Sequence, residues 1–502
     1  MKQYFYHNFF ICVCIVLCAI LPASGQDVQA QSDSIAQTLT LEQAIEMAQA
    51  QSVDAVVALD RLRTAYWQYR TYRAELLPEV NFTGDLPNYK SGYNLYQEGD
   101  GSYKFVRSRL LQASGSLSID QNIPLTGGRI SVVSSLEYVR PFTKANHFLT
   151  IPATITLVQP ILGYNALRWQ TKIQPVKYEE AKAAYLEERE KTTMRTISHF
   201  FELLLADENL RIAIQNRENA KKLHEVAKAK REMGQISENE LLQLELNLLQ
   251  ANGKETEARS LRNGKLFRLK SFLGIITDGD ILPVVPASVD AKRIHYGDVL
   301  AKAHKNNSFV HRIRRKQLEV DSEVARAKGE RYKVDLFASL GYTGQHEQWR
   351  EAYGNLQENQ IVQVGVRIPL LDWGKRKARV KMAESARDVM RSQIKQETQQ
   401  FDQDLFLLVE QLNNQAQQLH IARSADRIAE KRYKTGIETF MIGKISTLEL
   451  NDAQKARDEA RQKHISELFF YWYYFYQVRS LTLFDYIKES EISYDADLFK
   501  RL

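Results

Sequence analysis

The residue types that carry out catalysis are scattered along this sequence of 502 residues. None of its ten histidines stands in an HExxH pattern or in another spacing typical of metal ligands. Gly436 and the pair Gly443-Lys444 resemble a phosphate-binding loop, but six residues separate these glycines and Ile445 follows the lysine. A functional loop of this kind needs about four residues between its glycines and a serine or threonine after the lysine. The sequence therefore predicts no catalytic residue, no metal and no cofactor.

The three cysteines all lie within the first 18 residues. Residues 1–25 combine a basic start, an apolar run too short to span a membrane stably, and small residues at the end, which is the layout of a secretory signal peptide. Cleavage after Gly25 would leave a mature chain without cysteine, and hence without disulfides or thiol chemistry. A lipoprotein anchored through Cys18 is the alternative, although Leu17 stands where a small residue is expected. Residues 26–39 form a polar, flexible lead-in.

Composition and charge exclude several classes of protein. Charged residues make up 26% of the chain and aromatic residues 10%, which is typical neither of a disordered chain nor of a polytopic helical membrane protein. The net charge of +7 comes from 68 basic and 61 acidic residues that are interleaved, so no nucleic-acid partner is expected. The longest apolar run after the first 25 residues, at 468–476, is too short to span. An exported protein of this kind would enter a membrane through β-strands.

The chain contains a duplication. A Pro-hydrophobic motif at Pro160 is repeated at Pro369, and a Gly-x-Ile-Ser motif at Gly234 is repeated at Gly443. Both pairs are displaced by 209 residues, so the segment between the two motifs has the same length in each copy. A repeat of this size is typical of a duplicated domain rather than a solenoid. The fixed length favours a rigid spacer, such as a long helix.

Hydrophobic periodicity predicts the same helices in both copies. The expected helices are an opening helix at 40–77 and 296–332, a long helix at 165–233 and 375–442, and a return helix at 237–273 and 446–479. A helix of this greater length would extend about 100 Å at 1.5 Å per residue. An opening and a return helix, stacked end to end, would match one long helix in height. We therefore expect a first repeat at 40–273, a linker at 274–295, a second repeat at 296–485 and a tail at 486–502.

Between the opening and long helices, the spacing of the hydrophobic residues changes from the period of a helix to the period of a strand. In the second copy, 334–340 and 362–368 alternate as two strands joined by a polar loop at 343–360. The first copy is longer here by 45 residues and contains an additional alternating hairpin at 113–138. Whether this hairpin joins the sheet is open, so that each chain has four or six strands. Residues 86–110 are expected to form another exposed polar loop.

Four strands cannot close a barrel, and an open sheet edge in lipid leaves backbone groups without hydrogen bonds. Three or more chains must therefore share one barrel. The fold class that follows is mainly α, with a duplicated, coiled-coil tunnel of long helices and β-hairpins that join a transmembrane barrel shared between three or more chains. Such a tube conducts material and has no need to transform it.

These features together resemble the TolC-type outer-membrane efflux and secretion ducts, over essentially the whole mature chain. The resemblance also rests on the residues at 450–454, 471–474 and 479–485. It implies a homotrimer with a shared 12-stranded barrel in the outer-membrane lipid of a Gram-negative bacterium and a tunnel that extends into the periplasm. It also implies a periplasmic adaptor and an inner-membrane pump of the RND or ABC type as partners. A non-conducting periplasmic coiled-coil scaffold or adhesin is the alternative.

The resemblance further implies roles for particular residues. In such ducts acidic side chains close the periplasmic tip, and the matching pore-constriction candidates here are Glu449 and Asp452, with Glu240 in the first repeat. Residues three apart share one helical face, so three copies would form acidic rings that attract cations. The alternative is a solvated carboxylate at a helix start, where the helix dipole favours it.

Two further groups of candidates mark the ends of the long helices. The hairpin tips, which the resemblance implies dock the adaptor, comprise Gly234, Ile236, Ser237, Gly443, Ile445 and Ser446. The strand-to-helix junctions comprise Pro160, Pro369, Trp373 and Gly374. Trp373 suits either the membrane–water boundary or the protein core. The aromatic run at 469–476 is expected to pack in the core.

Overall fold

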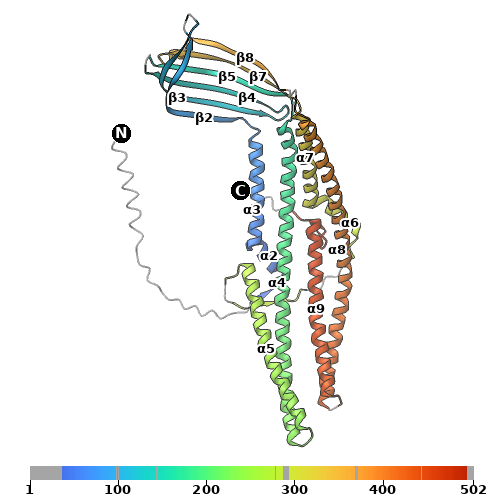
Figure 1. Ribbon diagram of the computed structural model, residues 1–502. Helices are drawn as coiled ribbons and strands as arrows, with labels where there is room; N and C mark the ends of the chain where they lie inside the picture. The colour runs from blue at the N-terminus through green and yellow to red at the C-terminus, as the bar shows by residue number, and fades with distance from the viewer. Residues whose placement is uncertain are drawn as a thin grey trace, which may run out of the picture.

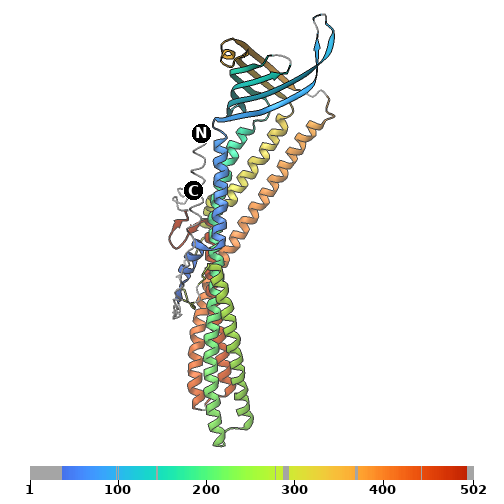
Figure 2. The same cartoon turned by 90° about the vertical axis from the view of Figure 1, so that its left-hand side faces the viewer.

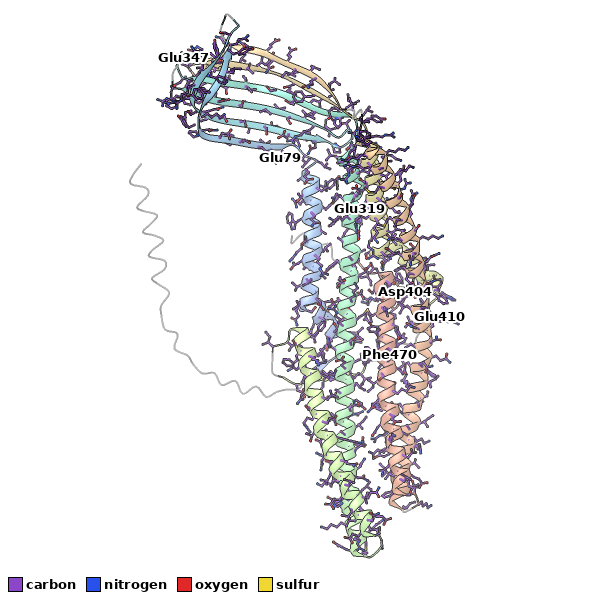
Figure 3. The ribbon with its side chains drawn as sticks, in the orientation of Figure 1. Glu79, Glu319, Glu347, Asp404, Glu410 and Phe470 are labelled. Atoms are coloured by element: carbon purple, nitrogen blue, oxygen red, sulfur yellow. The ribbon has the colours of Figure 1, made fainter. Side chains whose placement is uncertain are left out.

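The molecule is elongated, with one β-sheet at the end of a long bundle of helices (Figure 1 and Figure 2). The computed structural model describes residues 37–97, 99, 101–142, 145–276, 279–286, 293–367, 371–442 and 444–493. In Figure 3, Glu79 marks the end of the sheet next to the helices and Glu347 its far end. The helices run away from the sheet and end in two helical hairpins, which are the tips of the molecule.

The helices occur as two sets of equal length. The first set is α2 (Leu41–Gln51), α3 (Val53–Ala74), α4 (Ala166–Glu232) and α5 (Glu238–Leu273). The second set is α6 (Tyr296–Asn306), α7 (Ser308–Gly329), α8 (Lys375–Met441) and α9 (Thr447–Thr482). Both α4 and α8 have 67 residues and both α5 and α9 have 36, and each residue of the first pair lies 209 positions before its counterpart. The expectation of one long helix beside a shorter return helix is confirmed in both copies.

Each opening helix is broken, contrary to the prediction of a continuous helix at 40–77 and at 296–332. Ser52 and Asn307 have extended backbones between the two parts. The Ser52 hydroxyl accepts a hydrogen bond from the Ala55 amide at 3.2 Å, and the Asn307 side chain accepts one from the Phe309 amide at 2.8 Å. Both residues therefore act as N-caps that start a new helix.

The main hydrophobic core lies where the stacked helices meet. Phe200 and Leu203 of α4, Leu405 of α8 and Val478 of α9 are fully buried in it. The aromatic run of α9 contributes Tyr471, Trp472 and Phe475 to the same cluster, so its predicted role in packing is confirmed. In the part of the chain that the structure describes, no helix is both apolar and long enough for a membrane span.

Two pairs of short strands lie outside the main sheet. β1 (Gln37–Leu39) pairs in parallel with β6 (Ile281–Pro283), and Leu39 and Ile281 are buried. Residues 37–39 were expected in the flexible lead-in, so that expectation is wrong for them; residues 26–36 lie outside the described part. β9 (Phe484–Asp485) pairs with β10 (Ser490–Glu491) after the end of α9.

The sheet has six antiparallel strands in the order β2-β3-β4-β5-β7-β8. The first copy contributes β2 (Glu79–Gln97), β3 (Tyr103–Ile123), β4 (Gly128–Pro141) and β5 (His147–Leu162). The second contributes β7 (Lys333–His346) and β8 (Leu356–Arg367), with a single turn of 3-10 helix, η1 (Glu351–Tyr353), between them. The pairing of β5 with β7 joins the two copies. The additional hairpin lies within the sheet, between β2 and β5, so each chain has six strands.

Of the two segments expected as polar loops, the first is mostly strand and the second is half strand. Residues 88–97 of β2 pair with 103–112 of β3, so the segment 86–110 is a β-hairpin with a short turn. Residues 343–346 and 356–360 likewise belong to β7 and β8. Among the described side chains of this hairpin, only Ser108 and Leu110 are half-buried, and the others are exposed on both faces. A strand exposed on both faces needs no alternation of apolar and polar residues, which explains why its sequence resembles a loop.

The turn between β3 and β4 is held against the start of α4. Gly127 has a positive φ of 77°, and a Cβ there would lie 2.8 Å from the Asn165 side chain. Asn165 caps α4 by accepting from the Arg168 amide at 2.9 Å, and its amide group donates to the Pro124 carbonyl at 3.0 Å. One side chain thus starts the long helix and fixes the additional hairpin to it.

Candidate functional site

The six-stranded sheet has one apolar face. Strand register places directly paired residues on the same face, so each face can be followed from strand to strand. One face carries Val80, Phe82, Leu117, Ile119, Ile130, Val132, Leu136, Ile155, Leu157, Leu336, Leu340, Val362 and Val364. In a single chain these side chains are open to the surroundings; Phe82 is 76% exposed and Val362 is 71% exposed.

The opposite face is mostly polar. It carries Asn81, Thr83, Ser114, Ser116, Ser118, Asp120, Arg129, Ser131, Thr154, Thr156, Asp335, Ser339 and Gln363. Ser131 donates to Asp120 within this face, and Arg129 forms an ion pair with the same carboxylate at 3.0 Å. A sheet with one apolar and one polar face is the pattern of a β-barrel wall that separates lipid from an aqueous channel.

The sheet has two free edges. In the described sheet, β2 and β8 each have a single neighbouring strand. β2 follows α3 and runs away from the helices, whereas β8 runs back toward them and precedes α8. The β2 edge of one copy can therefore pair antiparallel with the β8 edge of another. An open edge in lipid would leave its backbone groups without hydrogen bonds, which favours such a pairing.

Each long helix ends at the tip with the same backbone hydrogen bond. At the first tip the Gln235 amide donates to the Lys230 carbonyl at 2.9 Å, and Gly234 has a positive φ of 72°. This is the Schellman arrangement, in which a glycine ends the helix. At the second tip the Lys444 amide donates to the Thr439 carbonyl at 3.0 Å; Gly443 lies outside the described residues. Gly234 is thus a turn residue and not part of a helix.

A capping box starts each return helix. At the first tip the Glu240 amide donates to the Ser237 hydroxyl at 3.2 Å, and the Ser237 amide donates to the Glu240 carboxylate at 3.0 Å. Ser446 and Glu449 repeat this arrangement at the second tip, with distances of 3.2 and 2.8 Å. Two of the three constriction candidates therefore satisfy the first amides of their own helices.

The acidic candidates at the second tip have partners within the chain. The amide and hydroxyl of Ser446 hold the pKa of the Glu449 carboxyl below its ordinary value, so it stays ionised to a lower pH than an ordinary glutamate. The Asp452 carboxylate forms an ion pair with Arg432 of α8 at 2.7 Å. Both carboxylates are exposed on the first turns of α9. The Arg432 contact, which the sequence did not indicate, links α9 to α8 beside the tip.

The two tips differ in their apolar packing. At the second tip Tyr433, Leu450 and Ala453 form a buried cluster, and Ile445 packs against it. At the first tip the leucines at 242, 246 and 249 of α5 are exposed, and Ile236 is half-buried. Residues spaced in this way share one helical face. The first tip therefore has an apolar stripe, which the sequence analysis did not single out although its spacing is visible there.

A buried polar layer ties three helices together above the tips. The Arg457 guanidinium of α9 lies 4.2 Å from the ring centre of Tyr433 of α8 and donates to Asn216 of α4 at 2.9 Å. Asn219 donates to the Tyr433 hydroxyl at 2.7 Å, and Asn216 to Asp458 at 2.8 Å. This layer fixes the α8–α9 hairpin to α4. No sequence pattern indicated it, because Asn216 and Asn219 lie more than 200 residues before the residues of α8 and α9 that they contact.

The strand-to-helix junctions have unusual backbones. Pro160 lies near the end of β5, at an irregularity in its pairing with β7. Trp373 and Gly374 have φ angles of 52° and 81°, and the Asp372 carboxylate accepts from the Gly374 amide at 3.0 Å. Trp373 is 89% exposed, so in the single chain it is not a core residue. Pro369 lies outside the described residues.

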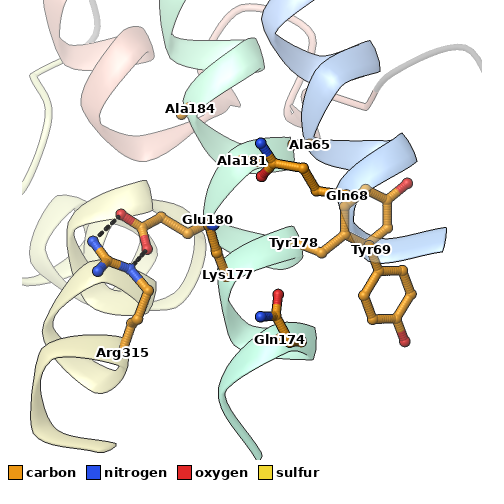
Figure 4. A pocket seen from close by; sticks show the side chains of 10 residues that line it. All are labelled: Ala65, Gln68, Tyr69, Gln174, Lys177, Tyr178, Glu180, Ala181, Ala184 and Arg315. Carbon is orange, nitrogen blue, oxygen red and sulfur yellow. Dashed lines mark hydrogen bonds and ion pairs between the residues drawn. The ribbon is translucent and has the colours of Figure 1, made fainter. Parts of the chain in front are cut away.

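A groove between α3, α4 and α7 lies near the sheet and is lined by side chains that pack against one another. Figure 4 shows Tyr69 of α3 close to Tyr178 of α4; the two rings are stacked with their centres 4.9 Å apart. Arg315 of α7 binds both oxygens of Glu180, at 2.6 and 3.2 Å, and these bonds raise the pKa of the arginine. Among the described residues there is no cluster of three or more metal-ligating side chains. The contacts that line this groove therefore hold α3, α4 and α7 together.

The architecture is that of an outer-membrane channel subunit. The chain aligns with the CmeC outer membrane channel of Campylobacter jejuni at a TM-score of 0.63 and 15% identity, covering 92% of this chain and 88% of that one. It aligns with the outer membrane protein VceC of Vibrio cholerae at a TM-score of 0.62 and 12% identity, covering 90% of this chain and 97% of that one. It aligns with the open state of the MtrE outer membrane channel of Neisseria gonorrhoeae at a TM-score of 0.56 and 13% identity, covering 88% of each chain. At these identities the likeness establishes the fold.

The sequence pattern of the outer membrane efflux proteins matches residues 142–275 and 311–467. This chain belongs to the outer membrane efflux protein family. It is an outer-membrane channel protein whose helices extend into the periplasm of a Gram-negative bacterium, and the family consists of channels rather than enzymes. No curated protein sequence matches this chain.

Proposed function

We propose that three copies of this chain form the exit duct of a tripartite export system. The duct would receive substrates from an inner-membrane pump, through a periplasmic adaptor, and release them outside the outer membrane. The observation that carries the proposal is a sheet with one apolar face and two free edges, continuous with helices of 67 residues. At 1.5 Å per residue each such helix is about 100 Å long, which suits a tunnel into the periplasm.

The strand number indicates a wide barrel. Six strands in each of three copies give eighteen, where the resemblance implied twelve. With strands about 4.8 Å apart and tilted by about 40°, the backbone diameter would be about 36 Å instead of about 24 Å. The extra strands account for the 45 additional residues of the first copy.

Exposed apolar stripes on the helices would join the copies along the tunnel. α5 carries the leucine stripe at 242, 246 and 249, and α8 carries exposed Ile421 and Ile428, one heptad apart. Apolar residues that repeat in this way pack between helices in coiled coils. We infer that the α5 stripe of one copy packs against α8 of the next. The free β2 and β8 edges would join the same two copies in the membrane.

The tips are the surface proposed for the adaptor. Gly234, Ile236 and Ser237 form the turn of the first tip, and Ile445 and Ser446 belong to the second. These turns lie at the end of the molecule farthest from the sheet (Figure 1). A partner that approaches from the inner membrane would meet them first.

The second tip is also the proposed constriction. Glu449 and Asp452 of three copies would form acidic rings, and the ion pair of Asp452 with Arg432 would hold each α9 close to α8. We expect that the double variant Glu449→Ala and Asp452→Ala raises single-channel conductance in planar bilayers by roughly two-fold or more and weakens cation selectivity. The double variant would remove the charge repulsion between the acidic rings of the three copies. It would also remove the ion pair that links α9 to α8.

Ser446→Ala is the matched control for this experiment. It removes the hydroxyl that caps α9 and leaves both carboxylates in place. We expect its conductance to equal that of the unmodified protein. An equal rise in the control would assign the effect to the loss of the helix cap, and unchanged conductance in the double variant would contradict the constriction.

A further inference from the structure

The hairpin of β2 and β3 extends beyond the rest of the sheet. β4 ends at Pro141, which is paired with Leu110, whereas β3 continues to Tyr103 and stays paired with β2 as far as Gln97. Figure 2 shows this hairpin rising above the other strands, at the end of the sheet away from the helices. Because the helices lie in the periplasm, this end of the sheet faces the outside of the cell.

The apolar face of the sheet continues onto this hairpin as an aromatic surface. Residues of β3 with odd numbers lie on the apolar face, and their partners on β2 lie beside them. The exposed aromatic side chains that follow from this register are Tyr89, Tyr93, Tyr103 and Phe105. The ring of Phe142, just after β4, packs edge-on against Tyr89 with centres 5.9 Å apart. Aromatic residues at this position in a barrel mark the boundary between lipid and water.

Three arginines lie on the same face. Arg107 and Arg109 are successive residues of that face on β3, and Arg140 of β4 is paired with Leu111, the next residue in the row. The backbone supports this placement, because the Phe142 amide donates to the Arg109 carbonyl at 3.0 Å. All three side chains are exposed, and within the described ranges none forms an ion pair with a carboxylate. We call this set the arginine cluster.

The arginine cluster lies about one membrane thickness from the helices. On β3 the apolar row runs from Ile119 to Leu111, and on β4 from Ile130 to Tyr138, which is nine residues in each strand. A tilted strand needs about 9–11 residues to cross the hydrocarbon layer. Arg109 and Arg140 come next in these rows, so both would lie at the level of the outer-leaflet headgroups.

We propose that the arginine cluster binds the phosphorylated headgroups of lipids in the outer leaflet. The proposal rests on the insertion of the sheet that the proposed function requires. Guanidinium groups bind phosphate oxygens in pairs, and cationic residues near a membrane surface attract anionic lipids. The cluster continues the lipid-facing side of the sheet and is flanked by aromatic rings, which favours a lipid over free phosphate. Bound lipids would hold the projecting hairpin against the membrane surface.

The test uses the full-length protein purified in mild detergent. Diphosphorylated lipid A and a phosphate-free analogue are added in turn, and retained lipid is counted by native mass spectrometry. The triple variant Arg107→Gln, Arg109→Gln and Arg140→Gln should bind the phosphorylated lipid at least about ten-fold more weakly. The matched control Lys90→Gln and Lys104→Gln changes two residues on the polar face of the same hairpin and should bind it as the unmodified protein does.

Two outcomes would overturn the proposal. One is equal retention of the phosphorylated lipid by the triple variant and the unmodified protein. The other is full displacement of that lipid by millimolar inorganic phosphate, which would indicate a simple anion site. Fractionation with outer membranes and conductance in bilayers are measured on the same samples. If the triple variant loses lipid binding but keeps its conductance, the result concerns the arginine cluster alone. If the unmodified protein fails to insert, the result contradicts the proposed function.

Discussion

Replacing Arg479 by alanine is expected to destabilise the folded protein by about 3–5 kcal/mol, because it leaves a buried carboxylate without its partner. That carboxylate belongs to Glu190 of α4, which is 0% exposed. Arg479 of α9 lies 3.2 Å from it and also 3.1 Å from the carboxylate of Asp485. The arginine thus ties α4, α9 and the segment after α9 together. The loss should appear as a lower midpoint of thermal unfolding in detergent.

The pH dependence of this variant separates a buried charge from a simple loss of packing. Burial raises the pKa of Glu190, and Arg479 opposes that rise. Without the arginine the folded-state pKa rises further, so the folded variant takes up a proton more readily than its unfolded chain. The stability deficit should therefore shrink as the pH falls through that raised pKa.

A double variant provides the control for this experiment. Replacing both Arg479 and Glu190 by methionine removes the two charges together and keeps apolar volume in the site. It should recover part of the lost stability, since apolar replacement of a buried ion pair is often neutral or stabilising. Asp485 also loses its arginine in this variant, but it keeps the hydrogen bonds from the Ile487 and Lys488 amides at 2.9 and 3.0 Å. Equal destabilisation by the single and double variants, with no effect of pH, would contradict the role assigned to the pair.

Replacing Leu242, Leu246 and Leu249 by serine is expected to abolish the proposed trimer. These side chains are 55%, 53% and 62% exposed in the single chain and lie on one face of α5. Each buried leucine contributes about 1.5–3 kcal/mol, so three such side chains at each of three interfaces make up a large share of the association free energy along the tunnel. Native electrophoresis in mild detergent should show single chains in place of trimers.

The same helix supplies a matched control. Gln243, Asn247 and Gln250 have the same spacing on an adjacent face of α5. Their replacement by alanine should leave the trimer intact. A trimer that survives the three leucine changes would show that this stripe does not join the copies, and dissociation of the control as well would indicate damage to the helix itself.

The long helices could be predicted because their physical signals are local. A constant displacement of 209 residues and a long run without glycine define α4 and α8, and Ser237 and Ser446 mark the starts of the return helices. The breaks at Ser52 and Asn307 were missed because the residues on either side continue to suit a helix. Only the observed hydrogen bonds identify these two residues as caps.

The candidate site could be predicted only in part. The family resemblance pointed to Glu449 and Asp452, but the partner of Asp452 lies on another helix and required the folded structure. The layer around Arg457 joins residues 241 positions apart and leaves no pattern in the sequence. The spacing of the leucine stripe is visible in the sequence, but the exposure of its side chains is seen only in the structure. The roles of all these residues in a pore depend on neighbouring copies.

The number of strands in the assembled barrel tests the central claim most directly. Electron cryomicroscopy of the full-length protein, purified from outer membranes in mild detergent, would show it. We expect a three-fold particle in which β2 of each copy pairs with β8 of the next, giving eighteen strands above a tube of helices. A single chain with unpaired sheet edges, or a trimer whose β3–β4 hairpin lies outside a twelve-stranded wall, would contradict this account.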